Sequence, residues 1–164
     1  MEKTEFDPSG EVTVAQAITM AARMHQLQAE DEITLKNHWF PWKWYKSYVK
    51  YALKNELIDE KYGDYSRKEM NSPVTRGELV EIFCNILPVE EYEAINEIPE
   101  NAIPDVSFTD RGASAIYTLY RAGILSGADD EYRFKADETV KRSEAAVIVA
   151  RMMDDDFRVE FTIE

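Results

Sequence analysis

The 164-residue sequence has little of several features that assign a protein to a specialised class. Its single cysteine cannot form a disulfide within the chain, and no residues have the spacing of a zinc site. Glycine and proline number only 6 each, which excludes collagen-like and low-complexity chains. No stretch approaches the roughly 18 consecutive apolar residues of a transmembrane helix. The remaining composition, with 45% hydrophobic residues, is that of a globular protein.

Basic residues are scarce relative to acidic ones. The chain has 19 lysines and arginines against 32 aspartates and glutamates, which gives a net charge of −13. Such a charge repels the phosphate backbone of nucleic acids and anionic membrane surfaces, and no local basic patch compensates for it. We therefore expect neither a nucleic acid nor a membrane as a partner.

Three segments of the chain repeat one pattern, a valine-led polar motif followed by an apolar run. They are Val12–Met24, Val74–Ile86 and Val140–Met152, and their starts lie 62 and 66 residues apart. Thr13 and Thr75 stand at the N-cap position of a predicted helix, with Gln16 and Glu78 three residues later, which is the spacing of a capping box. The third copy has Lys141 at the cap position, so we expect its box to be incomplete.

A second pair of segments also matches, and predicts a helix that precedes each of the last two motifs. These segments are Trp44–Leu53 and Arg111–Tyr120, with apolar residues at helical spacing. Gly123 suits the left-handed residue that ends a helix, whereas Glu56 at the equivalent place is a poorer stop. The repeating unit is therefore helix, loop and capped helix, and the chain has the second half of one unit followed by two complete units.

This combination resembles the S-layer homology (SLH) domain family, whose hallmark is an Ile/Val-Thr-Arg-Ala-Glu motif at the start of the second helix. Residues 74–78 (Val-Thr-Arg-Gly-Glu) match it closely, and residues 140–144 (Val-Lys-Arg-Ser-Glu) match with Lys in place of Thr. The family's Asp-Val opening stands at 105–106, its Gly-Ile-x-x-Gly turn at 123–127 and a Trp-Tyr-x-x-Tyr-Val helix start at 44–49. The resemblance covers nearly the whole chain.

The resemblance implies a mainly α fold of helix–loop–helix repeats in a three-pronged, pseudo-threefold arrangement, with the first repeat truncated. The repeats would span 1–30, 31–98 and 99–164, the last with a short C-terminal extension. Similar modules hold secreted proteins non-covalently on the Gram-positive cell wall. They bind secondary cell wall polysaccharide, often pyruvylated, in grooves between neighbouring repeats. The resemblance implies no cofactor, no metal and no catalytic residue.

The arginine of the motif recurs among the ligand contacts of the family, which points to Arg76 and Arg142. An arginine in the first turn of a helix adds a bidentate donor to the positive end of the helix dipole, an arrangement suited to a carboxylate. Repeat one has Val14 where the arginine belongs and Gln16 where the glutamate belongs, so we expect its groove not to bind. The predicted glycan-binding set comprises Arg76, Arg142, Thr75, Glu78, Lys141, Glu144, Trp44, Gly123 and Gly127.

Other readings of these residues remain open. Arg76 and Arg142 could merely pair with acidic neighbours, and Trp44 with Tyr48 and Tyr51 could be core residues. The repeats could also form a protein–protein adaptor that binds no glycan. The sequence does not indicate an enzyme, since neither histidine has a nucleophile or acidic residue at a spacing typical of a catalytic site. Cys84 occupies the motif position held by Ala22 and Ala150 in the other repeats, which favours a small core residue over a nucleophile. The acidic runs at 129–131 and 154–156 do not follow a calcium-loop pattern.

Two expectations follow from the truncated first repeat. The polar, acidic stretch 1–10 does not have the layout of a signal peptide, so an exported protein would carry its export signal and the rest of repeat one further upstream. Ile18, Ala21 and Ala22 would face the absent helix. We therefore expect self-association, or cover from the segment 159–163, whose alternation of apolar and polar residues predicts a short strand.

Overall fold

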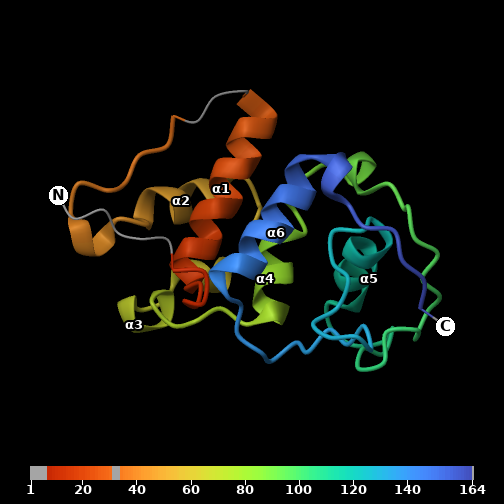
Figure 1. The fold of residues 1–164 in the computed structure, drawn as a ribbon. Coiled ribbons are helices and arrows are strands. Elements are labelled where there is room, and N and C mark those ends of the chain that lie inside the picture. The colour runs from red at the N-terminus through yellow and green to blue at the C-terminus, as the bar shows by residue number, and fades with distance from the viewer. Residues whose placement is uncertain (1–6, 31–33, 164) are drawn as a thin grey trace.

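The computed structural model describes residues 7–30 and 34–163, which form a mainly helical fold (Figure 1). The α-helices are α1 (Val14–Glu30), α2 (Lys46–Lys54), α3 (Arg67–Met70), α4 (Arg76–Phe83), α5 (Ala113–Arg121) and α6 (Arg142–Met153). Short 3-10 turns lie at η1 (Pro41–Lys43), η2 (Glu60–Gly63), η3 (Val89–Tyr92) and η4 (Asp155–Phe157). Within these two ranges no β-strand is present, and no helix is long and apolar enough to cross a membrane.

The three motif helices α1, α4 and α6 begin side by side, because their valines form a closed ring of backbone hydrogen bonds. Val12 N–H donates to Val140 O (2.9 Å), Val140 N–H to Val74 O (3.1 Å) and Val74 N–H to Val12 O (2.8 Å). All three valines are buried. The ring joins positions that are far apart in the chain, so the repeats meet at one central junction.

A second set of bonds serves the first turn of each motif helix, where backbone N–H groups have no partner within the helix. The amide of the first helical residue donates to a loop carbonyl that precedes a different motif: Val14 to Ser72 (3.1 Å), Arg76 to Glu138 (2.8 Å) and Arg142 to Gly10 (2.8 Å). Each loop thus closes on the helix of a neighbouring repeat, and the order of neighbours is cyclic.

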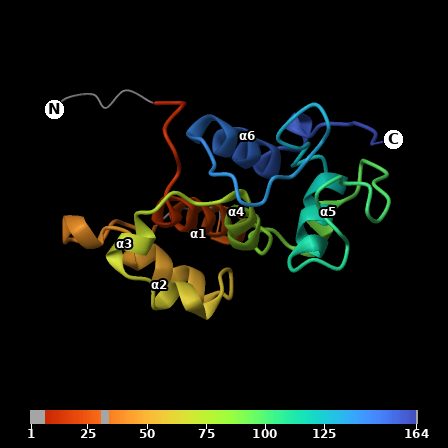
Figure 2. The ribbon, with the colours of Figure 1, turned by 90° about the horizontal axis from the view of Figure 1, so that it is seen from below.

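Two further helices cover the central group from outside. Helix α2 packs along α1, and its unit reaches α4 through Asn85 Nδ2, which donates to Leu57 O (3.5 Å). Helix α5 packs on α4, and its unit reaches α6 through Arg151 Nη1, which donates to Ile124 O (3.2 Å). Figure 2 shows α5 beside α4 and α6, and α2 beside α1. Among the described residues, no helix occupies the corresponding place between α6 and α1.

The expectation that Ile18, Ala21 and Ala22 lack cover is wrong, since all three are fully buried. The first helix of repeat two, α2, packs along α1, with Tyr48 and Ala52 also fully buried. A repeat's second helix is therefore covered by the first helix of the next repeat, a pairing that sequence periodicity does not reveal.

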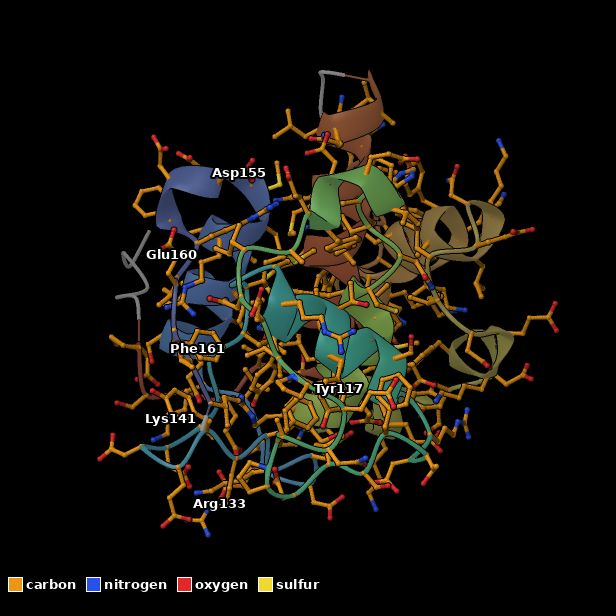
Figure 3. All side chains as sticks on the ribbon, turned by 90° about the vertical axis from the view of Figure 1, so that its right-hand side faces the viewer. Tyr117, Arg133, Lys141, Asp155, Glu160 and Phe161 are labelled. Atoms are coloured by element: carbon orange, nitrogen blue, oxygen red, sulfur yellow. The ribbon has the colours of Figure 1, made fainter. Side chains whose placement is uncertain are left out.

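The C-terminal segment does not cover repeat one, and it forms no strand. Val159 N–H donates to Gly123 O (3.1 Å), and Phe161 N–H donates to Asn96 Oδ1 (2.8 Å). The ring of Phe161 stacks on Tyr132, with centroids 5.3 Å apart. Figure 3 shows Phe161 on the side of the molecule that carries α5. The segment completes repeat three instead, because its backbone finds partners in the loops around Gly123 and Asn96.

The helix ends at Glu56 and Gly123 have the same geometry, although a glutamate is a poorer left-handed residue. Glu56 has φ 56° and Gly123 has φ 71°. The following amides, of Leu57 and Ile124, donate to carbonyls five residues earlier, at 2.9 and 3.0 Å. The turn of repeat two therefore forms even though Glu56 is less suited than glycine to a left-handed backbone.

Candidate functional site

The predicted caps position the first turns of the motif helices. Thr75 Oγ1 accepts the amide of Glu78 (3.2 Å), and Glu78 Oε2 accepts the amide of Thr75 (3.0 Å). Thr13 and Gln16 make the same reciprocal pair at 3.3 and 3.0 Å. These capping boxes confirm the sequence prediction. In the third helix only Glu144 contributes, by accepting the amide of Lys141 (2.8 Å), because an ammonium group cannot accept a hydrogen bond.

Two grooves lie between neighbouring motif helices. We call the first the α4–α6 groove, with a volume of about 180 Å³. It is lined by Arg76, Ile124, Leu125, Ser126, Gly127, Glu144, Val147, Ile148 and Arg151. Gly127 belongs to its wall with φ 87°, and a Cβ there would lie 2.6 Å from Tyr132 Cα. Only glycine fits this close approach of two backbone segments.

The side chain of Arg76 in the α4–α6 groove is almost completely buried and is bonded to other parts of the protein. It is 5% exposed, and its Nε donates to Phe134 O (2.6 Å). Its Nη1 lies 3.4 Å from Glu144 Oε1, and the guanidinium stands over the Phe134 ring. Asp105 fixes this loop by accepting the amide of Phe134 (2.7 Å). Arg76 therefore ties repeat two to repeat three, and its charge is balanced by a carboxylate.

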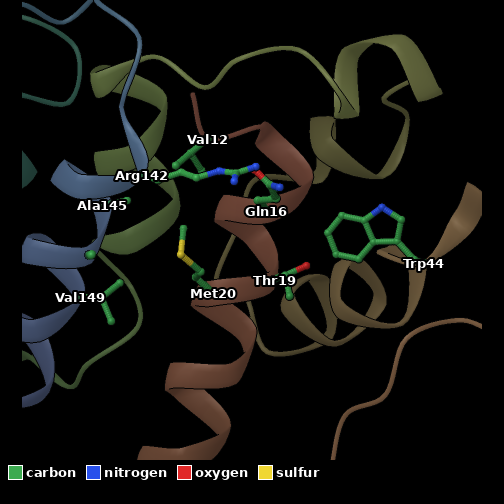
Figure 4. Close-up of a pocket in the computed structure, with 9 residues that line it drawn as sticks. Val12, Gln16, Thr19, Met20, Trp44, Arg142, Ala145 and Val149 are labelled. Atoms are coloured by element: carbon green, nitrogen blue, oxygen red, sulfur yellow. The ribbon is translucent and has the colours of Figure 1, made fainter. Parts of the chain in front are cut away.

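We call the second groove the α1–α6 groove, and it has a volume of about 510 Å³ (Figure 4). It is lined by Val12, Gln16, Thr19, Met20, Trp44, Arg142, Ala145, Ala146 and Val149. The walls are mostly apolar, and the polar groups gather at the end where α6 begins. Trp44 comes from the start of repeat two, and its ring packs edge-on against Tyr45 and Tyr48.

Arg142 differs from Arg76 in its surroundings. Its side chain is half-buried, and within residues 7–30 and 34–163 it makes no ion pair or hydrogen bond. Figure 4 shows its guanidinium directed toward Gln16 of α1. Gln16 holds the motif position that Glu144 holds in repeat three, so an uncharged amide faces Arg142 where a carboxylate faces Arg76. Arg142 is therefore a charged donor without a charged partner in the described chain.

Sequence reasoning missed this relation although its signal was present. Gln16, Glu78 and Glu144 hold the same position in the three motifs. The sequence prediction therefore placed Gln16, the residue that replaces the glutamate, in a groove of repeat one. In the structure, the residue at this position faces the arginine of the preceding motif in the cyclic order, so Gln16 lies in the groove of Arg142. Val14, at the arginine position of repeat one, is buried.

The remaining predicted residues lie outside the two grooves or at their edges. Thr75 and Glu78 act in the cap of α4, and Lys141 is exposed before α6. Gly123 packs against the C-terminal segment, where an added Cβ would lie 2.7 Å from Val159 O. Trp39 and Trp42 are exposed and line neither groove.

Other reactive side chains have structural partners. Burial raises the pKa of the Cys84 thiol, so it is a poor nucleophile. His38 Nδ1 accepts the amide of Phe40 (3.2 Å), and His25 lies 3.0 Å from the Tyr51 hydroxyl. Asp129 is held by Arg133 and Lys135. The part of the chain that the structure describes contains no cluster of three metal-ligating side chains.

Part of the lining of each groove comes from a segment that comparison with known families recognises. Residues 103–146 match the S-layer homology domain. The matched segment includes α5, the turn at Gly123 and Gly127, and the start of α6 with Arg142. No curated protein matches the chain. The resemblance is thus confirmed for residues 103–146, and an S-layer homology domain indicates anchoring at the cell wall and association with the cell surface.

Proposed function

We propose that this chain is a non-covalent anchor that binds an acidic secondary cell wall polysaccharide in the grooves between its S-layer homology repeats. The repeats would span 1–30, 31–98 and 99–164 and form a pseudo-threefold assembly. The ring of hydrogen bonds among Val12, Val74 and Val140 supports this arrangement, because each repeat gives and receives the same bond. The anchor would act outside the cell, on a protein that reaches the wall by export.

The observation that carries the proposal is the unpaired guanidinium of Arg142 in the α1–α6 groove. It stands in the first turn of α6, where the helix dipole also favours an anion. A pyruvate ketal presents a carboxylate on a sugar ring, and a guanidinium fork binds a carboxylate through two parallel hydrogen bonds. The apolar wall and the Trp44 ring suit the faces of the attached sugar.

The other predicted residues take different roles in this proposal. Arg76 and Glu144 shape the α4–α6 groove, and their mutual contact leaves the groove with less charge to offer an acidic sugar. Thr75 and Glu78 cap the start of α4, the exposed Lys141 precedes α6, and Gly123 and Gly127 set the turn beside the α4–α6 groove. In this proposal the grooves bind a ligand and catalyse no reaction.

Retention on purified cell-wall sacculi tests the function. The protein should be retained by intact sacculi and lost from sacculi whose glycan is stripped by hydrofluoric acid. Arg142→Ala should weaken retention about 10-fold or more, the effect of one charge-assisted hydrogen bond. Arg111→Ala is the matched control, because this arginine is 86% exposed and lies outside both grooves.

Two results would count against the proposal. Equal retention by stripped sacculi would indicate a protein partner, as expected of an adaptor. Equal retention of the Arg142→Ala and Arg111→Ala variants would remove the α1–α6 groove from the binding site. Because the net charge of −13 repels an anionic glycan at long range, moderate salt should strengthen wild-type retention unless the local contacts dominate.

A further inference from the structure

One stretch of this acidic chain contains basic charges only. Residues 33–55 include five lysines and no aspartate or glutamate, although acidic residues outnumber basic ones by 32 to 19 in the whole chain. The lysines are Lys36, Lys43, Lys46, Lys50 and Lys54. The expectation that the chain has no local basic patch is therefore wrong for this stretch. Figure 1 shows η1 and α2, which carry four of these lysines, on the side of the molecule away from α5.

Three of the lysines form a row along the exposed face of α2. Lys46, Lys50 and Lys54 are each four residues apart, so they lie on one face of the helix at intervals of about 6 Å along its axis. All three are exposed, whereas the buried face of α2 packs on α1. Lys43 stands about one turn before Lys46, because the two residues between them have right-handed helical backbone angles. We call Lys43, Lys46, Lys50 and Lys54 the lysine row.

No carboxylate balances the lysine row within the part of the chain that the structure describes. There its side chains form no ion pair and no hydrogen bond. The cations that do form ion pairs lie elsewhere in the chain: Lys61, Arg76, Arg111, Arg133, Lys135 and Arg158. Like charges four residues apart on a helix repel each other, and a cation at the first residue, as at Lys46, opposes the helix dipole. An anionic ligand would relieve this repulsion.

The lysine row is not a feature of the repeated unit. Helix α5 is the equivalent of α2 in repeat three, and it contains no lysine. Its one cation, Arg121, donates two hydrogen bonds to Ile98 O, at 3.0 and 2.8 Å. Neither the α1–α6 groove nor the α4–α6 groove has a lysine in its lining. The row is thus a separate surface that only repeat two presents.

An exposed aromatic turn stands at the start of the lysine row. Trp39 is 78% exposed and Trp42 is 49% exposed. Both rings lie against the ring of Phe40, with centroids 3.7 and 4.9 Å apart. The ammonium group of Lys43 lies 6.0 Å from the centroid of Phe40, so the aromatic turn and the row are continuous. Exposed tryptophan rings offer flat apolar surface on which the faces of sugar rings can pack.

A pocket of about 250 Å³ lies beside the row. Lys46 and Lys50 line it together with Tyr62 and Tyr65, whose ring centroids are 5.0 Å apart. Tyr62 is buried, and Tyr65 is half-buried. A ligand that follows the row therefore meets aromatic surface beside two of its charges as well as at its start.

We propose that the lysine row and the aromatic turn bind a linear acidic polysaccharide that carries carboxylates on successive sugar rings. The interval of about 6 Å between lysines is comparable to the length of one sugar ring, so successive carboxylates can each meet an ammonium group. Trp39 and Trp42 then contact the faces of the rings at one end of the bound strand. This surface goes beyond the proposed function, because it lies outside both grooves and uses neither motif arginine.

Charge complementarity favours a single polysaccharide strand over a membrane or a nucleic acid. A membrane or a duplex is a broad anionic surface, and it would also meet the exposed acidic residues that follow α2, which are Glu56, Asp59 and Glu60. A strand touches only the row. A surface for single-stranded nucleic acid has aromatic rings on which successive bases stack, whereas the rings of the aromatic turn lie against one another.

Calorimetric titration of the whole protein with polygalacturonate at low ionic strength tests the proposal. The wild-type protein should bind this polymer, and added salt should weaken the binding because the lysines are exposed. Arg142→Ala should bind it as tightly as the wild type, whatever this variant does on sacculi. The lysine row and the proposed function can therefore fail independently of each other.

Lys46→Gln together with Lys50→Gln should weaken the binding about 5-fold, the combined effect of two exposed ion pairs. Glutamine is also a good helix former, and circular dichroism checks that α2 persists. The matched control is Arg67→Gln together with Lys68→Gln. It removes two exposed cations of α3 that do not line the pocket beside the row, and it should leave the affinity unchanged.

Trp39→Ala tests whether the ligand is a sugar. It should weaken the binding of polygalacturonate more than that of poly-L-glutamate, which has carboxylates but no sugar rings. An equal effect on the two polymers would overturn the assignment of a polysaccharide.

Four further results would overturn the proposal. The wild-type protein could fail to bind polygalacturonate, or the two double variants could lose affinity equally. Tighter binding of anionic phospholipid vesicles or of single-stranded DNA, with the same dependence on Lys46 and Lys50, would assign the row to a membrane or a nucleic acid. Loss of polygalacturonate binding in Arg142→Ala would place the polymer in the α1–α6 groove instead.

Discussion

The carboxylate of Glu144 lies 3.4 Å from the guanidinium of Arg76, the arginine of the preceding motif rather than that of its own helix. Its other oxygen accepts the amide of Lys141 (2.8 Å), so one side chain both caps α6 and balances the charge of a neighbouring repeat. In the next repeat of the cyclic order, Gln16 holds this position and faces Arg142. This difference of one residue type decides which arginine is paired with a carboxylate and which has no charged partner in the described chain.

Gln16→Glu should therefore convert the α1–α6 groove into the kind found around Arg76. The new carboxylate would pair with Arg142 and compete with an acidic ligand. We expect retention on sacculi to fall about 10-fold, the value of one charge-assisted hydrogen bond. The helix cap would persist, because glutamate also serves in the box of Thr75. The Gln16→Glu, Arg142→Ala double variant should be no weaker than Arg142→Ala alone; additive losses would show that the two residues act separately.

Arg76→Ala should affect stability more than binding. The substitution removes the buried hydrogen bond to Phe134 O and leaves Glu144 without its cation. Loss of a buried, charge-assisted contact costs about 2–3 kcal/mol, whereas Arg142→Ala should change the free energy of unfolding by less than about 0.5 kcal/mol. Urea unfolding of both variants measures this contrast. Equal stabilities would mean that Arg76 does not tie repeat two to repeat three.

The two equivalent turns should respond in opposite directions to exchange of their left-handed residue. Glu56→Gly should stabilise the protein by about 0.5–1 kcal/mol, because a residue with a Cβ is strained at φ 56°. Gly123→Ala should destabilise it by about 2 kcal/mol or more, since the added Cβ would lie 2.7 Å from Val159 O. Thermal unfolding distinguishes the signs. A neutral Gly123→Ala would show that the C-terminal segment moves freely away from this turn.

Lys141→Thr should complete the capping box of α6. Glu144 already accepts the amide of residue 141, and a threonine hydroxyl would accept the amide of Glu144 in return, as at Thr75. We expect a gain of about 0.5–1 kcal/mol in the free energy of unfolding. Thr75→Ala should lose about 1 kcal/mol and serves as the reciprocal comparison. No gain from Lys141→Thr would indicate that the lysine stem already stabilises this helix start.

Asp129 should contribute to stability in acid. Desolvation would raise the pKa of this carboxyl, but hydrogen bonds from Arg133 and Lys135 outweigh it and lower the pKa from 3.8 to about 2. A group with a lowered folded pKa stabilises the protein above its unfolded pKa, and this contribution is lost as pH falls through the folded pKa. Asp129→Asn should therefore flatten the decline of stability between about pH 4 and pH 2. An unchanged pH profile would show that the carboxylate is not held in this way.

The local features of the fold were predictable from the sequence. The motif spacing gave the helix starts at Thr13 and Thr75, and the absence of a hydroxyl at Lys141 gave the incomplete box. These features depend on residues within one helical turn, so their hydrogen bonds follow from spacing alone. Gly123 as a left-handed residue was predictable for the same reason. Glu56 was not, because the packing of the surrounding unit holds it at φ 56° in spite of its own preference.

The relations between repeats were decided only by the tertiary structure. Sequence alignment placed Gln16 and Glu144 in one column but could not show that each faces the arginine of a different repeat. The packing of α2 along α1, and the packing of residues 159–163 beside Gly123, likewise depend on which segments become neighbours. The sequence thus determined the repeated unit and its candidate arginines. The cyclic packing of the units decided which arginine is paired with a carboxylate and which faces an open groove, because charge balance depends on distances between residues far apart in the chain.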